Sequence, residues 1–226
     1  MDAVGALGRT ILFGGLDPRA LAEIAARTAH RRYRKGNVIF VQGEAGERCF
    51  MIGSGTVKIS AYHSDGREAV LAVLGPGDVL GELALFEQSP RSADATALED
   101  AELLSLDAQS LNEAILAHPQ IAVALLNVLG MRLRQSNEAF QDIAFFDVPG
   151  RVARRLADLA DAHGVEAAEG TLIDITLSQE SLAQMVGATR ESVNKALALL
   201  KRRGLVARTG KRYIVSDVRR LRDRAR

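Results

Sequence analysis

Residues 177–200 read LSQESLAQMVGATRESVNKALALL, two helix-compatible runs that meet at a glycine. Ser178 and Thr189 each stand where a side-chain oxygen can cap the first turn of a helix. Gly187 lies between the runs and tolerates the positive φ of a tight turn, and Ala183 is small where the two helices would touch. The stretch therefore predicts a helix-turn-helix unit.

The second of these helices has one apolar and one polar face. Its apolar stripe is formed by Val193, Leu197 and Leu200. At about 100° per residue the opposite side carries four polar residues: Arg190, Glu191, Asn194 and Lys195. An arginine presents two donors that match guanine, and a glutamate accepts from cytosine, so this face is suited to DNA bases in the major groove. An exposed, salt-bridged helix is the alternative.

Residues outside the second helix are suited to the DNA backbone. Gln179 and Thr189 stand at the helix N-termini, where backbone N–H groups bind phosphates. Residues 205–216, LVARTGKRYIVS, predict a wing-like hairpin that brings Arg208, Lys211 and Arg212 alongside. The distribution of charge along the chain also indicates a polyanionic partner for the C-terminal part. Residues 148–226 hold 16 Lys and Arg against 9 Asp and Glu, whereas residues 1–147 hold 13 against 19. A solvated face with a charged C-terminal tail would give the same asymmetry.

The N-terminal part has a different residue pattern. Asp17-Pro18 predicts the start of a helix that ends near Arg27. Between residues 32 and 105, short apolar runs such as VIF, TVKISAY and AELLSL alternate with glycine-containing turns. This spacing predicts a compact antiparallel β-sandwich or roll, so the chain as a whole is expected to be α+β.

A long helix is predicted between the two parts, from Pro119 to Phe146. Apolar residues follow a 4-3 spacing along it, which is typical of a coiled-coil seam: Ala122, Leu126, Leu129, Leu133, Phe140 and Ile143, with the polar Ser136 on the same seam. The seam predicts a homodimer. An amphipathic helix packed on its own β domain is the alternative.

A break follows the long helix at five residues: Phe146, Asp147, Val148, Pro149 and Gly150. Asp147 can cap a new helix, and Pro149 falls in its first turn, where a missing N–H costs little. We interpret this segment as a hinge. The expected domains are residues 1–118, 119–146 and 147–226.

Composition narrows the classes of function. A single cysteine, Cys49, excludes an internal disulfide and an iron-sulfur cluster held by one chain. No window is long and apolar enough for a membrane span and no secretory leader is evident, so a cytoplasmic protein is expected. No catalytic or metal motif is found, and four histidines are scattered without ligand spacing: His30, His63, His118 and His163. We expect neither an enzyme nor a metal or cofactor site.

Four stretches resemble the CRP/FNR family of bacterial transcription regulators, which includes the cyclic-AMP receptor protein. GELALFEQSPRSADATA (residues 81–97, hereafter the cassette) is similar to the family's phosphate-binding cassette. RQSNEAF lies where the family's central helix meets the nucleotide, FFDVPGRVARRL is similar to its hinge, and TRESVNKAL matches its recognition helix. The resemblance covers nearly the whole chain.

The resemblance implies a site for a cyclic nucleotide. Arg91 would pair with the cyclic phosphate, Ser92 would donate to it, and Glu82 would accept from the ribose 2′-hydroxyl. Gly81 to Leu85 would form a helical turn with amides facing the phosphate, while Ser136 of one subunit and Asn137 of the other would bond the base. The full expected set is Gly81, Glu82, Leu83, Ala84, Arg91, Ser92, Ser136 and Asn137. A surface ion pair between Glu82 and Arg91 is the alternative.

The resemblance also implies partners and leaves the effector open. It implies a homodimer that binds double-stranded DNA, with cyclic AMP as effector and RNA polymerase as a further partner. The family's best-studied members have threonine then serine where this chain has Ser136 and Asn137, so cyclic GMP remains possible. The cassette is one residue shorter than the enterobacterial form, and Lys195 replaces an arginine. A different effector, including haem bound by Cys49 or His63, and activity without ligand are further alternatives.

Overall fold

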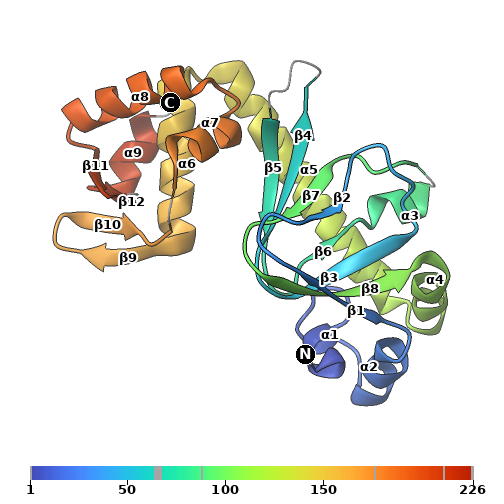
Figure 1. Ribbon diagram of the computed structural model, residues 1–226. Coiled ribbons are helices and arrows are strands. Elements are labelled where there is room, and N and C mark those ends of the chain that lie inside the picture. Colours follow the sequence, from blue (N-terminus) through green and yellow to red (C-terminus); the bar gives the residue numbers. More distant parts are fainter. Residues whose placement is uncertain (1, 64–67, 88, 176, 211, 225–226) are drawn as a thin grey trace. The chain divides into compact units, whose positions relative to one another are not determined.

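The computed structural model describes residues 2–63, 68–87, 89–175, 177–210 and 212–224 (Figure 1). The chain divides into two compact units, Met1–Leu133 and Arg134–Arg226, and the division falls within the long helix α5 (Gln120–Phe145). Each unit has its own hydrophobic core. The α+β class expected from the sequence is confirmed.

The first unit is built on two four-stranded sheets in which neighbouring strands run antiparallel. One sheet has the order β1-β8-β3-β6 and the other β2-β7-β4-β5. The strands are β1 (Ala29–Tyr33), β2 (Val38–Phe40), β3 (Arg48–Ser54), β4 (Val57–Tyr62), β5 (Glu68–Leu74), β6 (Val79–Leu80), β7 (Asp94–Ala97) and β8 (Ala101–Asp107). Seven of them coincide with the apolar runs read from the sequence.

Strand β3 separates two layers of core because its side chains alternate between faces. Phe50 and Ile52 pack between the two sheets. Cys49 and Met51 point the other way, against a layer of helices. These helices are α1 (Ala3–Gly8), α2 (Pro18–Ala25), α4 (Ala108–Ala117) and the first part of α5. The layer on β3 explains why this strand is an uninterrupted apolar run.

The second unit contains the helix-turn-helix and a four-stranded sheet of order β11-β12-β10-β9. Its helices after α5 are α6 (Val148–His163), α7 (Gln179–Val186), α8 (Arg190–Arg202) and α9 (Val218–Arg224). Its strands are β9 (Gly164–Ala167), β10 (Gly170–Ile173), β11 (Val206–Thr209) and β12 (Arg212–Val215). The helices and the sheet share one core that includes Leu156, Leu182, Val193 and Tyr213.

The predicted helix-turn-helix is confirmed in its local details. The Ser178 hydroxyl accepts from the backbone N–H of Ser181 at 2.9 Å, and the Thr189 hydroxyl accepts from that of Ser192 at 3.2 Å. Gly187 adopts the left-handed conformation with φ of 60°. These three residues therefore set both helix starts and the turn between them.

The structure also differs from the sequence prediction in several elements. The helical turn expected at residues 81–85 is instead α3 (Leu83–Glu87), because Gly81 has φ of 77°, which lies outside helical space. Helices α1 and α9 and strands β1, β9 and β10 were not predicted. The C-terminal segment, which the sequence allowed as a charged tail, is helical in α9 and buries Leu221 completely.

No single helix of the described residues is both long and apolar enough to cross a membrane. The consecutive helices α4 and α5 meet that criterion only as a pair, and they are bent by 116° relative to each other.

Candidate ligand site and DNA-binding face

Arg91 is the buried cation of the cassette, with 6% of its surface exposed. Its Nη1 donates to the carbonyl oxygen of Gly81 and its Nη2 to that of Arg48, both at 2.7 Å. The guanidinium lies over the Phe40 ring, 4.3 Å from the ring centre. Burial lowers the pKa of Arg91 from its ordinary value, because desolvation disfavours the charged form. The cassette thus holds a positive charge in an enclosed position.

The backbone comes close to this guanidinium because small residues surround it. A Cβ atom at Gly81 would lie 2.5 Å from Arg91 Nη1. A Cβ atom at Gly46 would lie 2.1 Å from the Cβ of Ala84, which is itself buried. Larger side chains at these positions would push the helical turn of α3 away from Arg91.

Glu82 is almost completely buried, with 1% of its surface exposed. Its Oε1 accepts from Arg132 Nη1, and Arg132 Nη2 donates to the Val79 carbonyl. Its Oε2 is buried and has no hydrogen-bond partner among the described residues. The expected alternative of a surface ion pair between Glu82 and Arg91 is wrong, since both side chains are buried and each has other partners. The unpaired oxygen is an acceptor available to a ligand.

The other expected ligand residues differ in exposure. Ala84 is buried beside Arg91, whereas Leu83 and Ser92 are exposed. Ser136 and Asn137 belong to the second unit, where both are exposed on α5. The structure therefore brings together Gly81, Glu82, Ala84 and Arg91. Sequence reasoning missed Arg132, although it lies one helical turn before Ser136, at a spacing that places both on one helix face.

An exposed apolar stripe of α5 contains residues of the predicted seam. Four of its residues are largely exposed within this chain: Leu126 at 66%, Leu133 at 63%, Phe140 at 72% and Ile143 at 61%. Ala122 and Leu129 are half-buried. The neighbouring face of the helix, with Ile121, Leu125 and Val128, packs on the core of the first unit. The helix thus satisfies its intrachain packing with one face and leaves another apolar face uncovered.

Four polar residues of α8 are exposed, as predicted: Arg190, Glu191, Asn194 and Lys195. Glu191 and Lys195 form an ion pair of 2.8 Å, and both side chains are more than three-quarters exposed, so the pair contributes little to stability. Val193 and Leu200 are fully buried beneath this face.

A cavity of about 220 Å³ lies between α8 and β11. It brings together three of the predicted DNA contacts, Gln179, Asn194 and Arg208, with Lys201 added to them. The Arg208 side chain donates to the Gly210 carbonyl at 2.9 Å, which holds it in the wing hairpin. Lys211 lies outside the described residues.

The segment predicted as a hinge, residues 146–150, is contacted by two arginines that sequence reasoning missed. Asp147 caps α6 by accepting from the Gly150 N–H at 2.7 Å, as predicted. Arg151 donates to the carbonyls of Phe146 at 3.0 Å and Val186 at 2.9 Å, so it ties the end of α5 to the helix-turn-helix. Pro149 lies in the first turn of α6 and is half-buried with Val148.

Arg154 makes a second link near this segment. It forms an ion pair of 3.0 Å with Asp142 of α5 and lies 5.8 Å from the centre of the Phe146 ring. Burial raises the pKa of Asp142, and the charge of Arg154 opposes that shift.

Comparisons with known proteins agree with this geometry. The family described as "Cyclic nucleotide-binding domain" matches residues 30–118, and the "Crp-like helix-turn-helix domain" matches residues 150–224. A "CRP-like cAMP-activated global transcriptional regulator" of Mycobacterium tuberculosis is 40% identical over 226 residues, which is the full length of both chains. The chain belongs to the CRP/FNR family of transcription regulators.

Two further CRP/FNR relatives are informative. The "Cyclic AMP receptor protein" of Thermus thermophilus is 34% identical over 195 residues, covering 86% of this chain and 87% of that protein. A solved structure, the c-di-GMP responsive global regulator CLP of Xanthomonas campestris, is 28% identical with a TM-score of 0.80 and covers 89% of this chain and 100% of its own. Like other CRP/FNR members, this chain is a DNA-binding transcription regulator with a cyclic nucleotide-binding domain, and members of the family are not enzymes.

Proposed function

We propose that this CRP/FNR regulator is a homodimer that binds a palindromic DNA site under allosteric control by cyclic AMP. The observation that carries the proposal is the pair of buried, opposite charges in the cassette. Arg91 offers a guanidinium for one phosphate charge, and Glu82 Oε2 offers an unpaired acceptor for a ribose hydroxyl. A cyclic nucleotide requires both.

Arg132 gives a physical route from the cassette to α5. It belongs to α5 and binds the same carboxylate that would receive the ribose. A ligand that hydrogen-bonds Glu82 would therefore change the environment of the central helix. Ser136 and Asn137 would complete the site at the base, where Ser136 of one subunit and Asn137 of the other would bond its polar edge.

The uncovered apolar stripe of α5 supports the homodimer. A largely exposed row of Leu126, Leu133, Phe140 and Ile143 is unfavourable in water, and a second copy would bury it as a coiled coil. In the dimer, two recognition helices α8 about 34 Å apart would enter successive major grooves. The ligand acts through its higher affinity for that arrangement, transmitted through the hinge at residues 146–150. RNA polymerase is the proposed further partner.

Three effectors are chemically consistent with the cassette. Cyclic AMP is favoured because the two relatives with 40% and 34% identity are described as responding to it. Cyclic GMP stays an alternative because the base-contacting pair here is Ser136-Asn137. The c-di-GMP named for the Xanthomonas regulator is a third candidate. A regulator that is active without ligand is the remaining alternative.

Calorimetric titration with the three nucleotides in parallel tests this proposal, because the chain has no tryptophan to serve as a fluorescent probe. We expect saturable binding of cyclic AMP to wild type and weaker binding in E82Q, because glutamine keeps one acceptor oxygen but loses the charge. The matched control is E99Q, which changes an exposed glutamate of the same unit. Binding of a different nucleotide would reassign the effector, and binding of none would favour the ligand-independent alternative.

A further inference from the structure

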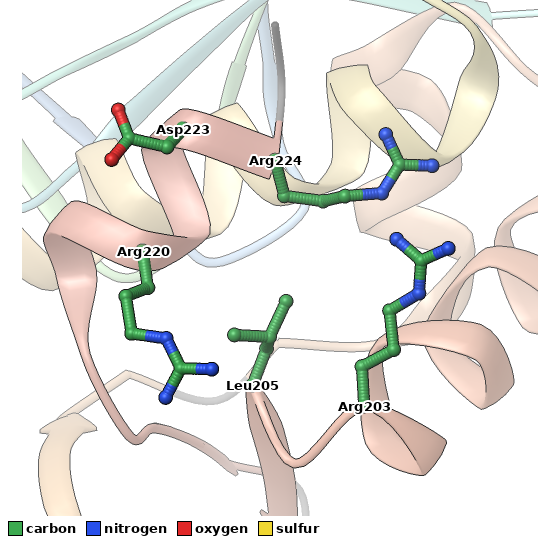
Figure 2. Close-up of a pocket in the computed structure, with 5 residues that line it drawn as sticks. All are labelled: Arg203, Leu205, Arg220, Asp223 and Arg224. Atoms are coloured by element: carbon green, nitrogen blue, oxygen red, sulfur yellow. The ribbon is translucent and has the colours of Figure 1, made fainter.

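A cavity of about 460 Å³ lies in the second unit, between the C-terminal end of α8 and the helix α9 (Figure 2). Five residues line it: Arg203, Leu205, Arg220, Asp223 and Arg224. Its volume is comparable to that of small-molecule sites, about 300–1,000 Å³, but it is open to solvent, and Arg203, Arg220 and Asp223 are exposed. The cyclic nucleotide site proposed above uses none of these residues.

The cavity carries an excess of positive charge. In Figure 2 the guanidinium groups of Arg203 and Arg224 converge on one side of Leu205, and the Asp223 carboxylate points away from them. Among the described residues, no ion pair involves Arg203 or Arg220. Like charges that converge in this way repel each other unless an anion lies between them.

Arg224 provides a second, independent observation. Its Nε is buried and has no hydrogen-bond partner among the described residues. Its nearest carboxylate, Asp147 Oδ2, lies 3.9 Å from Nη2, too far for a hydrogen bond. The neighbouring Arg222 differs, because it contacts Asp161 at 2.5 Å and Asp158 at 3.4 Å. Two of the arginines of α9 that line the cavity, Arg220 and Arg224, are thus without a close carboxylate partner among the described residues.

The position of the cavity separates it from the face that would read DNA. Arg203 follows Asn194 by nine residues, which at about 100° per residue places it roughly 180° round the helix axis. A duplex contacted by Asn194 would therefore lie on the other side of α8. The floor of the cavity is the buried side chain of Leu205, which suits a ligand with an apolar part.

We propose that this cavity is a second ligand site, which binds a soluble phosphate ester with at least two negative charges. Guanidinium groups bind phosphate oxygens through paired, charge-assisted hydrogen bonds, and two converging arginines would hold two such charges. Arg203 and Arg224 would bind the phosphate, Arg220 would add charge at the rim, and Leu205 would contact the organic part.

Calorimetric titration of the full-length protein with inorganic pyrophosphate, at constant ionic strength, tests the site. We expect a saturable isotherm with one site per chain for wild type. In R203Q/R224Q the affinity should fall about tenfold or more, because charge-assisted hydrogen bonds are lost. The matched control is R202Q/R219Q, which removes the same charge from exposed arginines of α8 and α9 and should bind like wild type.

Three results would overturn the proposal. One is the absence of saturable heat with wild type up to about 10 mM pyrophosphate. Another is an equal loss of affinity in R202Q/R219Q, which would indicate diffuse attraction by net charge. The last is a loss of binding in R91Q, which would place the anion in the cassette. If pyrophosphate fails to bind and R203Q/R224Q lowers the salt dependence of DNA binding more than the control does, the cluster contacts DNA phosphates and is not a small-molecule site.

Discussion

The Arg91 guanidinium donates to the carbonyl oxygen of Gly81 at 2.7 Å, so a buried cation joins two parts of the cassette that are ten residues apart. The same group reaches the Arg48 carbonyl of β3. Arg91 is therefore a structural residue as well as the proposed phosphate ligand, and a substitution there affects both roles.

The two roles of Arg91 can be separated by measuring ligand affinity and stability in the same variants. We expect R91Q to reduce cyclic nucleotide affinity by about 10- to 100-fold, and to lower the free energy of unfolding by about 1–3 kcal/mol because two partly buried carbonyls lose their donor. R91K should retain part of the affinity, since lysine keeps the charge without the fork. Calorimetry and urea denaturation measure the two effects. R31Q, an exposed arginine on β1, is the control and should change neither.

A double-mutant cycle tests the contact between Glu82 and Arg132. We expect R132M to destabilise the protein by about 1–3 kcal/mol, because it leaves the buried Glu82 carboxylate without its donor. The E82Q/R132M double variant should recover part of that loss, with a coupling free energy of about 0.5–3 kcal/mol. Urea denaturation of the four proteins gives the value. Additive effects would show that the contact does not form in solution.

Substitutions at Arg190 and Arg208 should impair DNA binding in different ways. R190Q is expected to cost about 1–3 kcal/mol of discrimination against a mutated half-site, because its guanidinium is exposed at the start of α8 where it can reach a base. R208Q is expected to weaken binding to all sequences and to reduce the salt slope by about one per subunit. Fluorescence anisotropy over a range of salt concentrations distinguishes them. The assignment of roles is wrong if R208Q alters discrimination and R190Q only the salt slope.

We expect the N-cap at Asp147 to contribute measurably to the stability of the second unit. We expect D147A to lower stability by about 1 kcal/mol, because the Gly150 N–H loses its acceptor at the first turn of α6. D147N retains a side-chain oxygen and should recover most of the loss. Thermal or urea unfolding measures the difference. Equal behaviour of D147A and D147N would indicate that charge, not capping, is what matters at this position.

Cys49 should be chemically inert in the folded protein. Burial on β3 raises the pKa of its thiol to about 12 from an ordinary value of 9.0, so the reactive thiolate is scarce at neutral and mildly alkaline pH. We expect no alkylation by iodoacetamide at about pH 8 without denaturant and complete alkylation in guanidinium chloride. Mass spectrometry measures both. Rapid labelling of the native protein would mean that β3 opens locally.

The parts of the fold that follow from local interactions could be predicted from the sequence. The caps at Ser178, Thr189 and Asp147 bind N–H groups only three residues away, and Gly187 is placed by its own φ. Strands β2 to β8 of the first unit were predicted because their apolar runs end at glycine-containing turns, whereas β1 was missed. Some observed ends of elements differ from the predicted ends by one or two residues. Helix α2, for example, ends at Ala25 and not near Arg27.

The contacts that the sequence did not reveal join distant residues. Arg132 and Glu82 are 50 positions apart, and Arg91 is 43 positions from Arg48. No spacing rule relates such pairs, because the two sheets and α5 must first fold to bring them together. Helix α9 was missed for another reason. Its sequence is mostly charged and Leu221 is its one fully buried residue, so no apolar periodicity marks its two turns.

The ion pair between Arg224 and the capping residue Asp147, at 3.9 Å, bears on how the protein should be prepared for experiments. A purification tag fused after Arg226 would begin three residues after Arg224 in the sequence and would add its own charges close to that residue along the chain. A polyhistidine tag there would titrate near neutral pH and mimic a regulatory effect. Tags placed before Asp2 would start in the first unit, on the helix cap of α1. For comparisons of DNA affinity between variants, the tag is therefore best removed by proteolysis.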